Sequence, residues 1–319
     1  MHSTTGTDIT KAIDLLKKGE LVGIPTETVY GLAANIEIHE AVAKIFEVKN
    51  RPSFDPLIVH LLEREQLDPI CHSIPKEFYL LYKAFCPGPI TFILPKKEKL
   101  SDLITAGHNT VGIRFPNHPL CRELLRESNL ALAAPSANPF GYVSPTSAAH
   151  VDQQLGKKIP YILDGGECKV GLESTIIDLS KKEISILRLG GLSMEEIEKV
   201  LGFKLKSSKI SSSNPQAPGM LSSHYSPSKK VFFDQDIEEN IEVDLNSIGA
   251  IRFKNYHPKI EKTNQWILSE KGDLNEAARA LFKVLRETDT TDLEIIYAEK
   301  FPDTGLGRAI NDRLKRAAY

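Results

Sequence analysis

Hydrophobic and polar positions along the first two-thirds of the chain alternate between two patterns. Apolar residues three or four positions apart, as in Ile9 to Leu16, predict helices, and short apolar runs that end in polar turns predict strands. Further helices are predicted at 41–46, 76–84, 119–127, 147–155 and 194–201, and strands at 21–25, 57–62, 90–94, 111–115, 130–134, 161–163, 175–179 and 184–189. This alternation predicts a mixed α/β domain with a large sheet, whose catalytic loops lie at strand ends.

Residues 207–228 break this pattern, because nine of the 22 positions are serine and three are proline. Such a composition favours an extended linker without a core of its own. Beyond it, strands are predicted at 230–233, 248–253, 266–269 and 294–298, and helices at 274–288 and 306–317. We therefore expect a domain at 1–206, a linker at 207–228 and a smaller α/β domain at 229–319.

Composition and charge narrow the class of protein. The 40 basic and 42 acidic side chains give a net charge of −2, which argues against a binder of bulk nucleic acid. The four cysteines are widely spaced and form no Cys-x-x-Cys pair, so neither a zinc site nor a disulfide scaffold is expected. A polar N-terminus and the lack of a run of about 18 apolar residues predict a cytoplasmic protein.

Polar residues gather in four places at the ends of predicted strands. The first group is the turn 25–31, rich in hydroxyls and with one carboxylate, which could also be an ordinary turn between strands. The second contains Lys49 and Arg51 in a proline-stiffened loop, followed by His60 at the end of the next strand. Two cations in such a loop can clamp phosphates, or they can complement the end of a helix.

The third and fourth groups lie on strands 111–115 and 130–134. Arg114 alternates with apolar neighbours, and a buried guanidinium requires a carboxylate partner. That partner is either a ligand or an internal acidic side chain. In the fourth group, small residues at 133–138 let a ligand approach the backbone, while Ser136 and Asn138 offer hydrogen bonds, although a simple turn has the same composition.

The motifs taken together carry more information than any one of them. GxGxxG, GxSxG and HExxH are missing from the sequence, so the common nucleotide and hydrolase patterns do not apply. The set resembles the YrdC-type family of threonylcarbamoyl-AMP synthases, in its long two-domain subclass. It comprises 25–31, Lys49-x-Arg51-Pro52, 56–60, 86–91, 111–116, 134–138, Ser144, 164–166, 173–175, 188–190 and 218–227.

This resemblance implies a YrdC-like twisted mixed sheet with flanking helices and a Rossmann-like C-terminal domain. It also implies synthesis of threonylcarbamoyl-AMP and pyrophosphate from L-threonine, bicarbonate and ATP with Mg²⁺. The product would serve tRNA threonylcarbamoyladenosine formation through downstream transfer enzymes, with at most a weak contact to tRNA itself. In this view the linker is also a lid, in which His224 and Tyr225 stand side by side.

The family's functional positions carry over residue by residue. The positions matching the threonine site are Thr28, His60, Arg114, Ala134 and Ser174. Those matching the ATP site are Arg51, Asp55, Thr110, Ser136, Ser144, Arg188 and Tyr225. The Lys-x-Arg and Ser-x-Asn pairs around the phosphates are Lys49, Arg51, Ser136 and Asn138. No metal ligands are expected from the protein, and Glu27 is expected to be a structural hydrogen-bond acceptor.

Two other functions remain as alternatives. One is a non-catalytic binder of double-stranded RNA or tRNA, which the charge balance disfavours because phosphate-backbone binding needs a net-positive face. The other is a carbamoyl-adenylate former of the hydrogenase-maturation type, which would carry additional modules that this chain has no room for.

Overall fold

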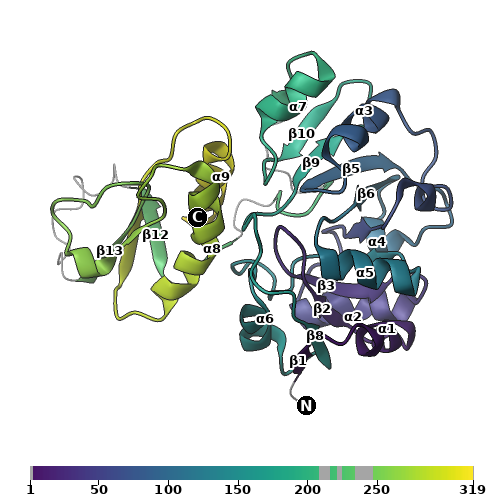
Figure 1. Cartoon of the computed structure of the whole chain (residues 1–319), viewed down its shortest axis with the longest axis horizontal. Helices are drawn as coiled ribbons and strands as arrows, with labels where there is room; N and C mark the ends of the chain where they lie inside the picture. Colours follow the sequence, from purple (N-terminus) through teal and green to yellow (C-terminus); the bar gives the residue numbers. More distant parts are fainter. Residues whose placement is uncertain (1–2, 208–215, 221–224, 234–246, 319) are drawn as a thin grey trace.

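The computed structural model describes residues 3–207, 216–220, 225–233 and 247–318, which form two α/β units (Figure 1). Within these residues the larger unit has a sheet of eleven strands in the order β1-β8-β2-β3-β7-β4-β6-β5-β9-β10-β11. The strands are β1 Thr4–Gly6, β2 Val22–Ile24, β3 Gly31–Asn35, β4 Ile58–His60, β5 Ile90–Pro95, β6 Thr110–Arg114, β7 Leu132–Ala133, β8 Tyr161–Leu163, β9 Thr175–Asp178, β10 Ser185–Arg188 and β11 Lys206–Ser207.

Helices flank this sheet and bury their apolar stripes against it. They are α1 Ile9–Lys17, α2 His39–Lys49, α3 Lys76–Phe85, α4 Asp102–Thr105, α5 Pro119–Ser128, α6 Ala148–Leu155 and α7 Met194–Leu201. Local sequence explains where they begin: α5 starts with a proline, and Ser193 and Glu196 form a reciprocal capping box at α7. Parallel and antiparallel pairs are both present in the sheet, so the predicted large mixed sheet is confirmed.

Strand pairing brings polar residues that are far apart in the sequence to one place. β4 pairs in parallel with β6, so that His60 lies opposite Arg114. On the other side of β6, Thr91 of the antiparallel β5 lies opposite Arg114 as well. The short β7 pairs with β4 and leads directly into Ala134, Pro135 and Ser136. The sheet therefore gathers the ends of these strands around a common point.

The smaller unit is a parallel sheet of four strands, within the described residues, in the order β12-β15-β13-β14. Its strands are β12 Lys230–Phe233, β13 Ile248–Arg252, β14 Gln265–Ile267 and β15 Ile295–Ala298, and its helices are α8 Leu274–Asp289 and α9 Gly307–Ala317. Asp273 caps α8 by accepting hydrogen bonds from the first-turn amides. The predicted small α/β unit is thus confirmed.

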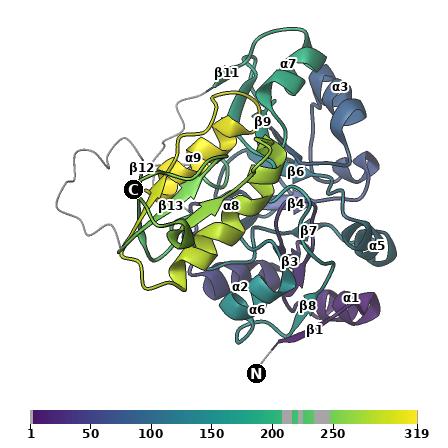
Figure 2. The ribbon, with the colours of Figure 1, turned by 60° about the vertical axis from the view of Figure 1, so that its left-hand side comes forward.

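Helices α8 and α9 lie between the small sheet and the large unit (Figures 1 and 2). The apolar cluster of the small unit includes Val29, Val143 and Leu172 of the large one, so the two units share a buried core. Gly171, with a φ of +78°, allows α8 to approach its backbone, because a Cβ there would lie 2.4 Å from Cα of Arg279. The interface is therefore a packed contact rather than a loose tether.

The structure contains three strands that the sequence pattern did not predict, β1, β3 and β11. β3 consists of Gly, Leu, two Ala and Asn, none of which is among the β-branched and aromatic residues that favour strands, and all five residues are buried. It forms because β2 and β7 flank it on both sides. Among the described residues, no helix is both long enough and apolar enough to cross a lipid bilayer.

Candidate active site

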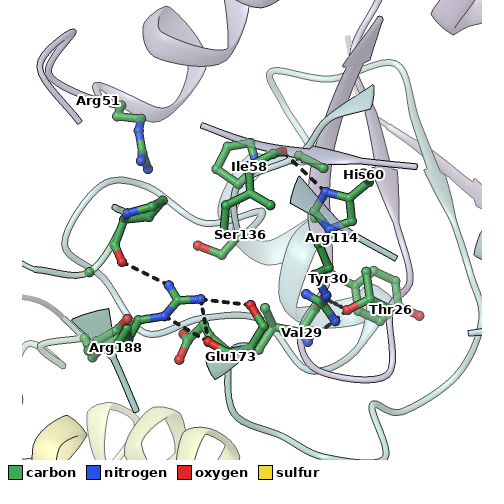
Figure 3. Close-up of a pocket in the computed structure, with 17 residues that line it drawn as sticks. Thr26, Val29, Tyr30, Arg51, Ile58, His60, Arg114, Ser136, Glu173 and Arg188 are labelled. Carbon is green, nitrogen blue, oxygen red and sulfur yellow. Dashed lines mark hydrogen bonds between the residues drawn. The ribbon is translucent and has the colours of Figure 1, made fainter. Parts of the chain in front are cut away.

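A pocket lies where the ends of β2, β4, β6 and β7 converge, and Pro218, Gly219 and Tyr225 of the linker also line it. Figure 3 shows its lining side chains. Eight of the predicted site residues line it: Arg51, His60, Arg114, Ala134, Ser136, Ser174, Arg188 and Tyr225. In Figure 3, Arg51 and Arg188 lie on one side of Ser136, and Arg114, His60 and Thr26 lie on the other. The pocket thus has two cationic ends.

Arg114 forms the first end. Its Nη2 donates to Oε1 of Glu27 over 2.8 Å, and both side chains are about 95% buried. Within the described part of the chain, Nε of Arg114 has no hydrogen-bond partner. Glu27 also accepts from the backbone N–H of Asn117. Glu27 therefore serves as the structural acceptor expected for it: it orients the guanidinium and leaves one buried N–H donor for a further acceptor.

His60 lies beside Arg114 and is buried. Its Nδ1 is 3.3 Å from the backbone carbonyl of Ile58. Burial and the neighbouring Arg114 cation lower the pKa of His60 to about 3. The imidazole is therefore neutral at physiological pH and contributes hydrogen bonding to this end of the pocket without adding a second positive charge.

The neutral state of His60 predicts a pH dependence of stability. The unfolded chain protonates this histidine near pH 6.5, whereas the folded chain resists protonation down to about pH 3. Between these values the unfolded state binds the extra proton, so the stability of the fold falls as the pH falls. From pH 7.5 to 5, the free energy of unfolding of the wild type should drop by about 2 kcal/mol more than that of His60→Gln. Urea titrations at both pH values measure this difference, and equal drops would contradict it.

Arg51 forms part of the second end. Its Nη2 pairs with Asp55 at 2.9 Å, and its Nε and Nη2 donate to the backbone carbonyls of Asp55 and Pro56. Lys49 lies behind the pocket wall, where Nζ donates to the carbonyls of Ser136 and Asn138. Burial, together with Arg51, holds the pKa of Lys49 well below its usual value. Through these two hydrogen bonds, Lys49 stabilises the conformation of the Ser136–Asn138 loop.

Arg188 completes the second end and connects it to the linker. It donates to the carbonyl and hydroxyl of Ser174 and, through Nη1, to the carbonyl of Pro218 over 3.1 Å. Gly219 has a φ of +79°, and a Cβ there would lie 2.5 Å from the hydroxyl of Tyr225. A glycine is therefore required where the linker crosses the pocket.

The remaining predicted residues do not line the pocket but stand directly behind it or near it. The hydroxyl oxygens of Thr28 and Thr26 lie 2.8 Å apart, and the Ser144 hydroxyl donates to Oε1 of Glu173 over 2.5 Å. Asn138 donates to the carbonyls of Pro139 and Tyr142. Thr110 starts β6, at the opposite end of that strand from Arg114. His224 lies outside the described residues.

Among the charged residues that the structure places at or against the site, sequence reasoning assigned no role to Glu173 and Arg313. Glu173 lines the pocket, and Arg313 of α9 binds it with Nε at 2.8 Å from Oε2. Glu173 stands in the Glu-Ser-Thr motif, which was a signal for its importance. Arg313 sits in an amphipathic helix among other cations, and nothing in that pattern distinguishes it. Its contact arises only when the two units pack together.

The charges of the pocket favour an anionic ligand at each end. The lining side chains include three guanidiniums and one carboxylate, Glu173, which Arg313 already neutralises. Burial alone would raise the pKa of Glu173, but Arg313 and Arg188 hold it below its usual value, so the carboxyl stays ionised. The arrangement can therefore hold a carboxylate at the Arg114 end and phosphates at the end formed by Arg51 and Arg188.

Comparison with known proteins identifies the family of this site. The family model described as telomere recombination, which covers Sua5, YciO and YrdC, matches residues 14–190. A second model, the C-terminal domain of threonylcarbamoyl-AMP synthase, matches residues 192–319. The chain is 41% identical to the threonylcarbamoyl-AMP synthase of Pyrococcus abyssi, over 96% of this chain and 93% of that protein. It is 39% identical to the Bacillus subtilis enzyme, over 99% and 94%.

A solved structure agrees with these sequence matches. The crystal structure of P. abyssi Sua5 with L-threonine superposes with a TM-score of 0.89 at 39% identity, and the match covers 99% of this chain and 97% of that one. Both units therefore have counterparts in one relative, and the resemblance drawn from the motifs is confirmed. The chain belongs to the threonylcarbamoyl-AMP synthase family, in the two-domain form that carries the C-terminal domain.

Proposed function

We propose that the pocket joins L-threonine, bicarbonate and ATP into threonylcarbamoyl-AMP and releases pyrophosphate. The observation that carries this proposal is the pair of cationic ends, one at Arg114 and the other at Arg51 and Arg188, within a single pocket. One end suits the carboxylate of an amino acid and the other suits phosphates. The relative from P. abyssi was solved with L-threonine bound, which supports threonine as that amino acid.

The threonine carboxylate would pair with Arg114, taking the Nε–H that Glu27 leaves unused. Neutral His60, the Thr28 and Ser174 hydroxyls and the Ala134 backbone would complete this subsite. The neutral threonine amine then attacks the carbon of bicarbonate, one C–O bond of bicarbonate breaks, and its hydroxyl leaves as water with a proton from the amine. The resulting carbamate carries a new carboxylate. That carboxylate attacks the α-phosphate of ATP, and pyrophosphate leaves.

The triphosphate would lie at the other end, held by cations and hydroxyls. Arg51, Ser136 and Arg188 line this end, and Asp55, Thr110, Ser144 and Tyr225 are the further residues assigned to ATP. Such a transfer requires little covalent chemistry from the protein, because positioning and neutralisation of the phosphate charge dominate. Lys49 and Asn138 would support these groups by fixing the loop that carries Ser136.

The described residues provide no set of protein ligands for Mg²⁺, because nowhere among them do three His, Cys, Asp or Glu side chains lie close enough together to hold a metal ion. The carboxylates closest to the second end, Asp55 and Glu173, are already paired with Arg51 and Arg313. We therefore assign Mg²⁺ to the ATP phosphates as part of the substrate and derive no step through it. The adenylate product would pass to enzymes that transfer threonylcarbamoyl groups to tRNA.

Pyrophosphate release tests this proposal directly. The full chain with ATP and Mg²⁺ should release pyrophosphate when threonine and bicarbonate are both present, and omission of either should remove most of the signal. Serine in place of threonine is the matched control, since it lacks one methyl group. Release that does not depend on threonine and bicarbonate would contradict the proposed reaction.

A further inference from the structure

The guanidinium of Arg313 is fully buried at the interface between the two units, although it belongs to α9 of the small one. Its Nε donates to Glu173 over 2.8 Å, and its Nη2 donates to the carbonyl of Leu189 over 2.9 Å. The neighbouring Asp312 binds Nη1 at 2.7 Å. Each of the three nitrogens thus has an acceptor, and two of these acceptors belong to the large unit.

Arg313 also faces the linker. Its guanidinium carbon lies 4.7 Å from the centre of the Tyr225 ring, within the range of a cation–π contact. On α8, Phe282 stacks on Tyr225 with ring centres 5.6 Å apart and planes 27° apart. Tyr225 is therefore held by two side chains of the small unit at the point where it lines the pocket.

The contact with Glu173 extends to a further residue assigned to ATP. Oε2 of Glu173 binds Arg313, and Oε1 accepts the hydroxyl proton of Ser144 over 2.5 Å. A rotation of the Glu173 carboxylate would therefore displace the Ser144 hydroxyl as well. A single guanidinium thus orients Glu173 and Ser144 on one side and Tyr225 on the other.

Contacts other than this buried pair also join the two units. Arg308 pairs with Glu195 at 2.8 Å, Arg279 donates to the carbonyl of Lys169, and Tyr142 donates to Asp289. A buried ion pair contributes little net stability, because desolvation of both charges offsets their attraction. What a buried ion pair does fix is geometry, and here that geometry belongs to the pocket.

We infer that Arg313 is a positioning residue through which the C-terminal domain organises the nucleotide end of the pocket. It holds the Glu173 carboxylate and the Tyr225 ring in place, while within the described part of the chain it makes no hydrogen bond or ion pair with Glu27, Arg114 or His60. The inference rests on the proposed function, since it takes the nucleotide to bind beside Ser144 and Tyr225. It predicts that Arg313 controls the affinity for ATP and leaves the affinity for threonine unchanged.

Separate calorimetric titrations of ATP with Mg²⁺ and of threonine test this selectivity in the full chain. In Arg313→Gln, we expect the Kd for ATP to rise at least tenfold and the Kd for threonine to stay within twofold. Arg313→Lys, which keeps the charge but loses the planar fork, should recover part of the ATP affinity. The matched control is Arg308→Gln, which removes the Arg308–Glu195 ion pair between the units and should leave both Kd values within twofold.

Glu173→Gln is the second variant, in case Arg313→Gln does not fold. It preserves the size of the side chain and weakens the pair from the other side, so the same selective rise in the Kd for ATP is expected. An ATP Kd within twofold of the wild type in either folded variant, or an equal rise in both Kd values, would overturn the positioning role. If the wild type bound no ATP, the proposed function would fail and this inference with it.

Discussion

Arg114→Ala should lower the affinity for threonine by about 30- to 1000-fold, corresponding to about 2–4 kcal/mol for a lost charge-assisted pair in a buried site. The physical reason is that Arg114 offers a buried N–H donor, Nε, without a partner among the described residues, at the end of the pocket that suits a carboxylate. Titration of threonine into the variant measures this loss. A change of less than threefold in a folded variant would mean that Arg114 does not hold the carboxylate.

The control for this experiment concerns Glu27, which loses its partner in Arg114→Ala. An unpaired buried carboxylate destabilises a fold by several kcal/mol, so the loss of binding could follow from unfolding. The double variant Arg114→Gln with Glu27→Gln leaves neither charge without its partner. A thermal unfolding experiment should therefore show that it remains folded. It should still lose threonine affinity, whereas Glu27→Gln alone keeps the guanidinium and should lose less.

Arg51→Gln should lower turnover by about 100-fold, because one preorganised donor to developing phosphate charge is worth roughly that factor. Arg51 lines the pocket, and Asp55 and two backbone carbonyls fix its guanidinium. We expect the Kd for threonine to change less than threefold, since Arg114 and His60 form the other end. Steady-state pyrophosphate release at saturating ATP measures the effect, and a turnover equal to that of the wild type would exclude the role.

Asp55→Asn distinguishes the contribution of the Arg51 guanidinium to turnover from that of the carboxylate that pairs with it. This substitution keeps Arg51 in place and removes only the negative charge beside it, so the reduction in turnover should be smaller than in Arg51→Gln. If Asp55→Asn reduced turnover as strongly as Arg51→Gln, the carboxylate rather than the guanidinium would be the group that matters at this end.

The sequence predicted those parts of the molecule that depend on local pattern. The strands carrying His60 and Arg114 follow from apolar runs, and their polar ends indicated where a site would form. β3 escaped prediction because its small residues become a strand only between β2 and β7. Tertiary pairing, rather than the preference of its residues, determines that element.

The partners of charged residues could not be predicted in the same way. The sequence left open whether Arg114 pairs with a ligand or with an internal acid. The structure shows the internal pair with Glu27 and, beside it, a donor that faces no described partner. Arg313 was beyond prediction because its acceptor, Glu173, is 140 residues away and in the other unit.

The most direct test of the account follows the carbon atom of bicarbonate. The full chain is incubated with ¹³C-bicarbonate, L-threonine, ATP and Mg²⁺, and the adenylate is analysed at once by mass spectrometry. We predict a threonylcarbamoyl-AMP that carries the label, formed together with one pyrophosphate per adenylate. Pyrophosphate without a labelled adenylate, or an adenylate that contains threonine but no labelled carbon, would contradict the account.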